Sequence, residues 1–179
     1  MIKYKIILTG LIFLLISGFA NLAAQGKIYE ELYEQFGEIP EKMNSEDIKS
    51  YARSTKKVDK NHEFLLDNMM LEGRVLVPVG KRVKGKFVTL LYIEYDTKKD
   101  DEYFEFRFKT FNKKTGEIYM SSSHMLDIGK GGNTLYDGSY ILEGNFWTVT
   151  QIEKEGGAEK VKRMRYEFGK YLAFDEHLD

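Results

Sequence analysis

The chain has 179 residues, no cysteine, and 27 basic against 28 acidic side chains, which gives a formal net charge of −1. The absence of cysteine excludes disulfide bonds, thiolate chemistry and the lipid-modified cysteine of bacterial lipoproteins. The near-neutral charge argues against nucleic acid as a partner, because that binding needs a strongly basic surface. The length is typical of one domain with a substantial core.

Residues 1–24 have the order of a secretory signal peptide. Two lysines come first, the uncharged stretch Ile6–Ile16 follows, and small residues end the segment. The apolar stretch is short for a membrane span, although a retained anchor helix is the alternative interpretation. Cleavage is expected after Ala20 or after Ala24. It would remove two lysines, change the formal net charge from −1 to −3, and release an exported protein, periplasmic or secreted, without a transmembrane segment.

Residues 25–70 are expected to form a helical prefix. Apolar residues recur four positions apart from Ile28 to Phe36, with glutamates between them, which is typical of an amphipathic helix. Ser45 is a suitable N-cap for a second helix, because two acidic residues follow it in the first turn. A third, short helical segment is expected from His62 to Met70.

From residue 71 to residue 179 the apolar pattern alternates with a period of two, which predicts β-strands. Glycine-containing turns separate these strands. Gly144 and Gly169 each stand first in a two-residue hairpin loop, as a type II′ turn requires. The predicted strands cover residues 72–79, 86–95, 102–111, 117–126, 134–143, 146–154, 160–168 and 171–176.

Eight consecutive antiparallel strands predict a mainly β fold with an α-helical N-terminal prefix. Such a sheet has two exposed edges, and closure into an eight-stranded up-and-down barrel removes both of them. The alternatives are a β-sandwich and a curved sheet packed on helices. In a barrel, the helical prefix would lie across one mouth or against the outside of the sheet.

Over residues 71–176 this arrangement resembles the calycin group, which contains the lipocalins and the fatty-acid-binding proteins. The signature motifs of those families are absent, because Gly73 does not begin a Gly-x-Trp sequence, and Arg165 and Tyr166 are adjacent instead of forming Arg-x-Tyr. No site residue is therefore transferred from them. The resemblance implies a barrel fold that encloses an apolar ligand.

A hairpin is expected between the strands at 102–111 and 117–126. In its loop, Asn112 can open a type I turn and Gly116 can adopt the positive φ that follows. Pairing of Asn112 with Glu117 predicts five further cross-strand pairs: Phe104 with Met125, Phe106 with Ser123, Phe108 with Ser121, Glu105 with His124, and Arg107 with Ser122. A slip of one residue at Gly116 would exchange the two faces and place Phe104 beside His124.

The inner face of this hairpin is the candidate ligand-binding wall. The expected wall residues are Phe104, Phe106, Phe108, Ser121, Ser123 and Met125. Hydroxyl groups on an apolar wall can orient a mostly apolar ligand, because buried polar groups need partners. In the alternative interpretation, the serines bond to neighbouring backbone or to trapped water in a filled core. The charged residues between the phenylalanines, Glu105, Arg107 and Lys109, are expected in water.

The sequence contains no catalytic or metal-binding motif that we recognise. His62, His124 and His177 are scattered and form no HExxH sequence, so neither a metal ion nor a cofactor is expected. His124 opposite Glu105 is interpreted as an exposed ion pair and not as part of a catalytic triad. The basic stretch Gly80–Lys86 is interpreted as a solvated hairpin, with an acidic glycan or a lipid headgroup as an alternative partner.

These patterns predict an exported, non-enzymatic small β-barrel that binds a small apolar or amphipathic molecule. The alternative is a structural or protein-interaction component of the cell envelope, with a filled core. In that case the functional surface would lie outside the barrel, on the basic 81–86 loop or on the helical prefix.

Overall fold

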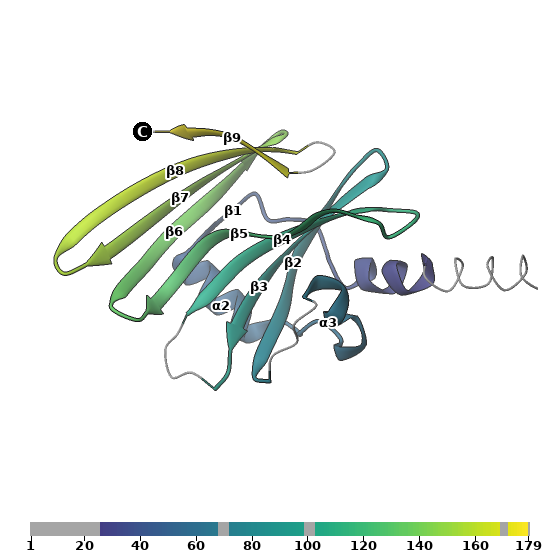
Figure 1. Ribbon diagram of the computed structural model, residues 1–179, viewed down its shortest axis with the longest axis horizontal. Coiled ribbons are helices and arrows are strands. Elements are labelled where there is room, and N and C mark those ends of the chain that lie inside the picture. Colours follow the sequence, from purple (N-terminus) through teal and green to yellow (C-terminus); the bar gives the residue numbers. More distant parts are fainter. Residues whose placement is uncertain (1–25, 68–71, 99–102, 169–171, 179) are drawn as a thin grey trace, which may run out of the picture.

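The computed structural model describes residues 26–67, 72–98, 103–168 and 172–178, and it describes residues 120–123 and 172–178 by their backbone alone. The expected signal peptide at 1–24 and the expected Gly169 turn lie outside the described residues. The protein is mainly β, with helices near its N-terminus (Figure 1). No helix among the described residues is long and apolar enough to span a membrane.

Each of the eight predicted strands is present, with its ends displaced by a few residues. The N-terminal segment contains a helix at 26–34, the short strand β1 (Lys42–Asn44), and the helices α2 (Ser45–Ser54) and α3 (Lys60–Leu66). The long strands are β2 (Arg74–Lys84), β3 (Phe87–Asp96), β4 (Phe104–Asn112), β5 (Ile118–Gly131), β6 (Thr134–Glu143), β7 (Phe146–Glu155), β8 (Ala158–Phe168) and β9 (Leu172–Leu178). No sequence pattern predicted β1.

The N-cap of α2 is Asn44 and not the expected Ser45. The Asn44 side chain accepts hydrogen bonds from the backbone N–H groups of Glu46 at 2.9 Å and Asp47 at 3.0 Å. Asp47 accepts in return from the Asn44 N–H at 3.1 Å, which completes a capping box. Ser45 is thereby the first helical residue, and its buried hydroxyl contacts β6.

The turn between β6 and β7 has the predicted geometry. Glu143 pairs with Phe146, so the loop contains only Gly144 and Asn145. Gly144 has a φ of 57°, and no described residue other than glycine has a positive φ. Positive φ at the first loop position alone is the pattern of a type II′ turn.

The strands form one antiparallel path from β2 to β9, and this sheet is not closed. The path opens between β5 and β6, which pair only from Gly129–Gly131 to Thr134–Tyr136. Beyond that point β1 pairs with β6 in place of β5. Figure 1 shows β6, β7 and β8 diverging from β2, β3 and β4. The expectation of a closed barrel is therefore not met, and the sheet with helices packed on it matches the alternative better.

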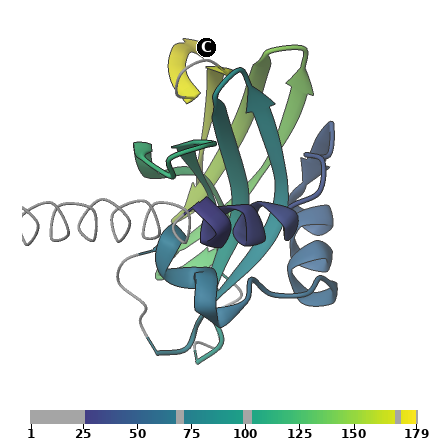
Figure 2. The ribbon, with the colours of Figure 1, turned by 90° about the vertical axis from the view of Figure 1, so that its right-hand side faces the viewer.

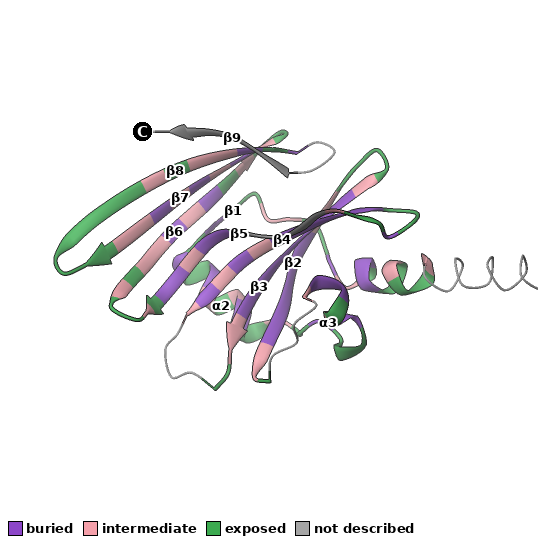
Figure 3. Ribbon diagram, in the orientation of Figure 1, coloured by how far each residue is buried: buried purple, intermediate pink, exposed green. Residues whose placement is uncertain are grey.

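Two hydrophobic cores lie on the two sides of β2, β3 and β4. The inner core joins these strands to β5–β8 and to Ile48 and Ala52 of α2. The outer core joins them to the helix at 26–34 and to α3. Figure 2 shows α2 and α3 on opposite sides of these strands, and Figure 3 shows that the strands are mostly buried. Burial on both faces explains uninterrupted apolar runs such as Leu90–Ile93.

The connection that leads to β1 crosses the edge of β2 at Gly80. Glu38 forms a parallel bridge with Lys81, and Lys81 N–H donates to the Gly37 carbonyl at 2.8 Å. A Cβ atom added at Gly80 would lie 2.6 Å from Ile39 Cα and 2.7 Å from Ile39 N. Because both neighbouring atoms belong to the backbone, only glycine permits this approach.

Replacing Gly80 with alanine should destabilise the fold by about 1–3 kcal/mol, because the crossing backbone must move. The free energy of unfolding in urea measures this change. The matched control is Gly37→Ala in the same crossing, because an added Cβ there meets no atom within 4 Å. It should change stability by less than about 1 kcal/mol. Equal effects of the two substitutions would show that the crossing is not tight.

Candidate functional site

The pairing of β4 with β5 begins as predicted and then changes. Asn112 N–H donates to the Glu117 carbonyl at 2.8 Å, and Gly116 has a φ of 68°. Three irregularities follow, and each adds one residue on β5. The five predicted pairs are therefore wrong. The observed pairs are Phe104 with Ile128, Glu105 with Asp127, Phe106 with Leu126, Arg107 with His124, and Phe108 with Ser123.

The three phenylalanines of the predicted wall do lie together in the inner core. Phe104, Phe106 and Phe108 are at most 4 % exposed, and Met125 belongs to the same core. The Phe106 ring lies 5.4 Å from the Tyr140 ring, and the Phe108 ring lies 6.1 Å from the Tyr166 ring. These rings therefore meet residues from β6 and β8 across the sheet. The side chains of Ser121 and Ser123 lie outside the described part of the structure.

Tyr140 and Trp147 extend this group of rings, which we call the aromatic core. The ring of Trp147 lies edge-on to Tyr140 at 5.2 Å and is stacked on Phe168 at 5.2 Å. The aromatic core consists of Phe104, Phe106, Phe108, Tyr140, Trp147, Tyr166 and Phe168. No sequence pattern indicated Tyr140 or Trp147 as site residues, although Trp147 is the single tryptophan of the chain.

Two polar atoms of the aromatic core are buried without a hydrogen-bond partner among the described residues. They are the Tyr140 hydroxyl and the Trp147 indole Nε1. The two side chains are no more than 1 % exposed. Burial raises the pKa of Tyr140, and the nearby Tyr51 and Asp47 of α2 raise it further, so the hydroxyl keeps its proton. Both atoms are therefore donors inside an otherwise apolar core.

Helix α2 covers one side of the aromatic core. Its buried residues are Ser45, Ile48 and Ala52. Its N-terminal end is bound to β6 through Ser45. The Ser45 Oγ donates to the Gly138 carbonyl at 3.0 Å and accepts from the Gly138 N–H at 2.9 Å. Near its C-terminal end, the Tyr51 hydroxyl donates to the Val79 carbonyl at 3.4 Å. The contact at the N-terminal end is thus the tighter of the two.

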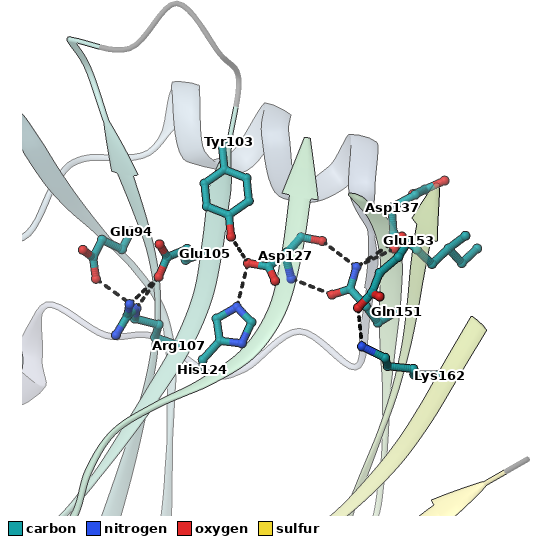
Figure 4. Close-up of polar contacts among 11 residues, drawn as sticks. Glu94, Tyr103, Glu105, Arg107, His124, Asp127, Asp137, Gln151, Glu153 and Lys162 are labelled. Atoms are coloured by element: carbon teal, nitrogen blue, oxygen red, sulfur yellow. Dashed lines mark hydrogen bonds and ion pairs between the residues drawn. The ribbon is translucent and has the colours of Figure 1, made fainter. Parts of the chain in front are cut away.

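Gln151 on β7 satisfies the backbone where β5 leaves β6 (Figure 4). Its Oε1 accepts from the Asp127 N–H at 2.7 Å. Its Nε2 donates to the carbonyls of Asp127 and Asp137, both at 3.1 Å. Gln151 is 4 % exposed and interrupts the apolar alternation that Trp147 and Val149 begin. That interruption is the sequence signal that could have identified it.

Glu105 and His124, which the sequence predicts opposite each other, have other partners. His124 Nε2 lies 2.6 Å from Asp127 Oδ1 and is not paired with Glu105. The Tyr103 hydroxyl donates to the same Asp127 oxygen, and burial together with this bond raises the pKa of Tyr103. Glu105 instead accepts from Arg107 Nε at 2.9 Å. Figure 4 shows the two groups side by side on β4 and β5.

The expectation that Lys109 lies in water is wrong. Lys109 is 3 % exposed beneath α3, and its Nζ donates to the carbonyls of Leu65 at 2.8 Å and Leu66 at 3.1 Å. These carbonyls belong to the C-terminal turn of α3, where a cation is favourable. Burial lowers the pKa of Lys109, and Asp67 partly offsets this effect.

Glu94 is buried on the same side of the sheet, between two arginines. Arg74 Nη1 donates to its Oε1, and Arg107 Nε lies 3.0 Å from its Oε2. The Glu94 side chain is 3 % exposed. Burial raises the pKa of Glu94, and the charges of Arg107 and Arg74 offset only part of that rise.

A separate surface pocket of about 540 Å³ lies at the far ends of β6, β7 and β8. It contains none of the expected wall residues, and it is lined by Thr134, Tyr136, Glu153, Glu155, Ala158, Glu159 and Lys160. Ion pairs engage two of its carboxylates, since Glu159 lies 3.3 Å from Lys154 and Glu153 pairs with Lys162. Ion-paired side chains therefore line part of this pocket.

No protein-family model matches this chain, and no significantly similar curated protein or solved structure was found. Within the described ranges, no three or more histidine, aspartate or glutamate residues are placed to hold a metal ion.

Replacing Gln151 with leucine should lower the free energy of unfolding by roughly 2–4 kcal/mol. The substitution keeps the size of the side chain but leaves buried groups of Asp127 and Asp137 without partners, and each such group costs about 1–3 kcal/mol. Thr148→Val, at a half-buried position of the same strand, is the matched control and should change stability little. If Gln151→Leu left the free energy of unfolding unchanged, water or a rearranged backbone would have to satisfy these groups equally well.

Glu94→Gln tests the raised pKa of Glu94 through the pH dependence of unfolding. A raised pKa means that folding favours the protonated carboxyl, so this stabilisation is complete below the unfolded value of 4.5 and is lost as the pH rises through the folded value. The stability of Glu94→Gln relative to the native protein should therefore increase as the pH rises above 4.5. Denaturant titrations from pH 4 to pH 8 measure the difference.

The control for this pH series is Glu72→Gln, which removes an acidic side chain that is 91 % exposed. If the stability of Glu94→Gln relative to the native protein decreased as the pH rises, the charges of the two arginines would lower the pKa of Glu94 by more than burial raises it.

Proposed function

We propose that this protein is an exported, non-enzymatic binding protein for a small amphipathic molecule. The apolar part of the ligand would lie among the rings of the aromatic core, and its acceptor group would meet the Tyr140 hydroxyl and the Trp147 indole N–H. The observation that carries the proposal is the pair of buried donors without a partner among the described residues. The predicted signal peptide at 1–24 supports export.

A ligand acceptor between these donors would give a favourable free-energy change. A buried polar group without a partner costs about 1–3 kcal/mol, so a molecule that accepts from both groups recovers part of that energy on binding. A carboxylate or phosphate oxygen suits the role best, because hydrogen bonds to charged acceptors are the stronger ones. The rings supply the apolar surroundings that are typical of small-molecule sites.

In this proposal α2 moves away from the inner core to admit the ligand. Its apolar anchors in the inner core are Ile48 and Ala52, and burial of one isoleucine contributes roughly 1.5–3 kcal/mol. The C-terminal end, held by the 3.4 Å contact of Tyr51, would lift before the Ser45 end. We also propose a calycin-like relation, in which an incompletely closed barrel uses a helix as its missing wall.

The second candidate function is an interaction protein of the cell envelope with a filled core. It is favoured by the close packing of the rings, because Phe106 and Trp147 are each 0 % exposed and contact other rings directly. In this function the buried donors would bond to water, and the surface would bind the partner.

A fluorescent fatty acid, 11-(dansylamino)undecanoic acid, separates the two functions when residues 25–179 are titrated after organic extraction. Binding in the aromatic core should transfer excitation from Trp147, the single tryptophan, to the dansyl group. Tyr140→Phe should weaken binding about 2–10-fold, which corresponds to one hydrogen bond of about 0.5–1.5 kcal/mol. Mass spectrometry of the organic extract would identify a co-purifying molecule.

Tyr33→Phe is the matched control for this titration. It removes a second buried hydroxyl that lacks a described partner, but one in the outer core and not in the aromatic core. It should leave the affinity unchanged. No energy transfer, or equal affinities for the native protein and Tyr140→Phe, would favour the filled core.

A further inference from the structure

Two hairpin tips of the sheet form one continuous surface, which we call the hairpin end. It consists of the β2–β3 turn at residues 83–87 and the β4–β5 loop at residues 113–119. The Lys113 N–H donates to the Lys86 carbonyl at 2.8 Å and joins the two. The Phe87 and Tyr119 rings meet edge-on at 4.7 Å and make a second connection.

The hairpin end is basic. Lys84, Lys86, Lys113 and Lys114 are exposed on it, and Glu117 is its acidic residue. Lys84 donates to the Phe168 carbonyl. The other three lysines form no ion pair with any carboxylate in the described part of the chain. Four cations on two adjacent turns therefore give this end a positive potential, although the whole chain is nearly neutral.

Aliphatic side chains project beside these lysines. Val83 is 47 % exposed and Ile118 is 45 % exposed, one on each hairpin. An aqueous polyanion would engage the lysines but would gain little from exposed aliphatic groups. The boundary between lipid headgroups and acyl chains accommodates both kinds of side chain, so the combination favours an anionic membrane surface.

The N-terminal helix packs against the β4–β5 loop of the hairpin end. An added Cβ at Gly116 would overlap the Tyr29 ring, so this residue of the helix at 26–34 lies directly against the β4–β5 loop. Tyr29 also contacts Phe111 at 5.7 Å, which ties the loop to the outer core. A loop that already packs against the rest of the protein loses less backbone conformational entropy on binding than a free loop does.

We propose that the hairpin end docks this protein on the anionic headgroups of a membrane surface. Lys86, Lys113 and Lys114 would contact lipid phosphates, while Val83 and Ile118 would enter the headgroup boundary. This inference is independent of the aromatic core and holds whether or not a ligand binds there.

Sedimentation of residues 25–179 with large vesicles tests the proposal. Binding should be clear with vesicles of 70 % phosphatidylcholine and 30 % phosphatidylglycerol, weak with phosphatidylcholine alone, and weaker at high salt. The combined variant Lys86→Gln, Lys113→Gln and Lys114→Gln should lose at least tenfold in affinity, since each lysine contributes roughly fivefold near an anionic surface. The control Lys56→Gln, Lys57→Gln and Lys60→Gln removes three exposed lysines from another part of the chain and should bind like the native protein.

A second pair of variants tests the aliphatic contribution. Val83→Ser with Ile118→Ser should reduce binding to the anionic vesicles, while Leu135→Ser with Val161→Ser, which changes two equally exposed residues elsewhere, should not. Circular dichroism confirms that each variant is folded. The proposal is overturned by equal binding to the two vesicle types, or by equal loss in both lysine variants. It is also overturned by binding to heparin without binding to vesicles, which would indicate a soluble polyanion as the partner.

Discussion

The structure depends on how the backbone is satisfied where β5 separates from β6. A strand that leaves its neighbour exposes N–H and C=O groups, and burying them without partners is costly. Here two separate parts of the chain replace the missing strand. β1 pairs with Ser139–Ile141 and the next residue, Ser45, bonds to Gly138, while Gln151 bonds to Asp127 and Asp137. The sheet is therefore open at this point, while backbone groups of Asp127, Asp137 and Gly138 keep partners, and α2 begins at Ser45 beside them.

Different helices pack against the two hydrophobic cores. The helix at 26–34 and α3 cover the outer core, so β2, β3 and β4 are buried on both faces over most of their length. α2 belongs to the inner core, where it contributes few apolar side chains. The proposed ligand site lies in the inner core beside α2, whereas the proposed membrane-docking surface lies on the turns that connect β2 with β3 and β4 with β5, beside the helix at 26–34.

Local sequence signals predicted the strands and turns well, because alternation and glycine positions are read directly from neighbouring residues. The registry of β4 with β5 was predicted only at its start, since nothing in the sequence around Phe108 marks the bulges that follow. The burial of Lys109 was missed because it depends on α3, which lies far away in the sequence. The aromatic core was half predicted: the alternation identified Phe104, Phe106 and Phe108, whereas their partners on β6 and β8 come from the long-range fold.

Among the described strands, β5 alone connects β2–β4 with β6–β9: it pairs with β4 along most of its length and with β6 at Gly129–Gly131. Separating the two parts of the sheet would therefore break the pairing of β5 with either β4 or β6. A chain cut within β5 would have to reassemble from two fragments to recover the fold. By contrast, the turn at Gly156 and Gly157 joins β7 to β8 and has open space around both residues. Inserted segments or new chain termini are best accommodated there.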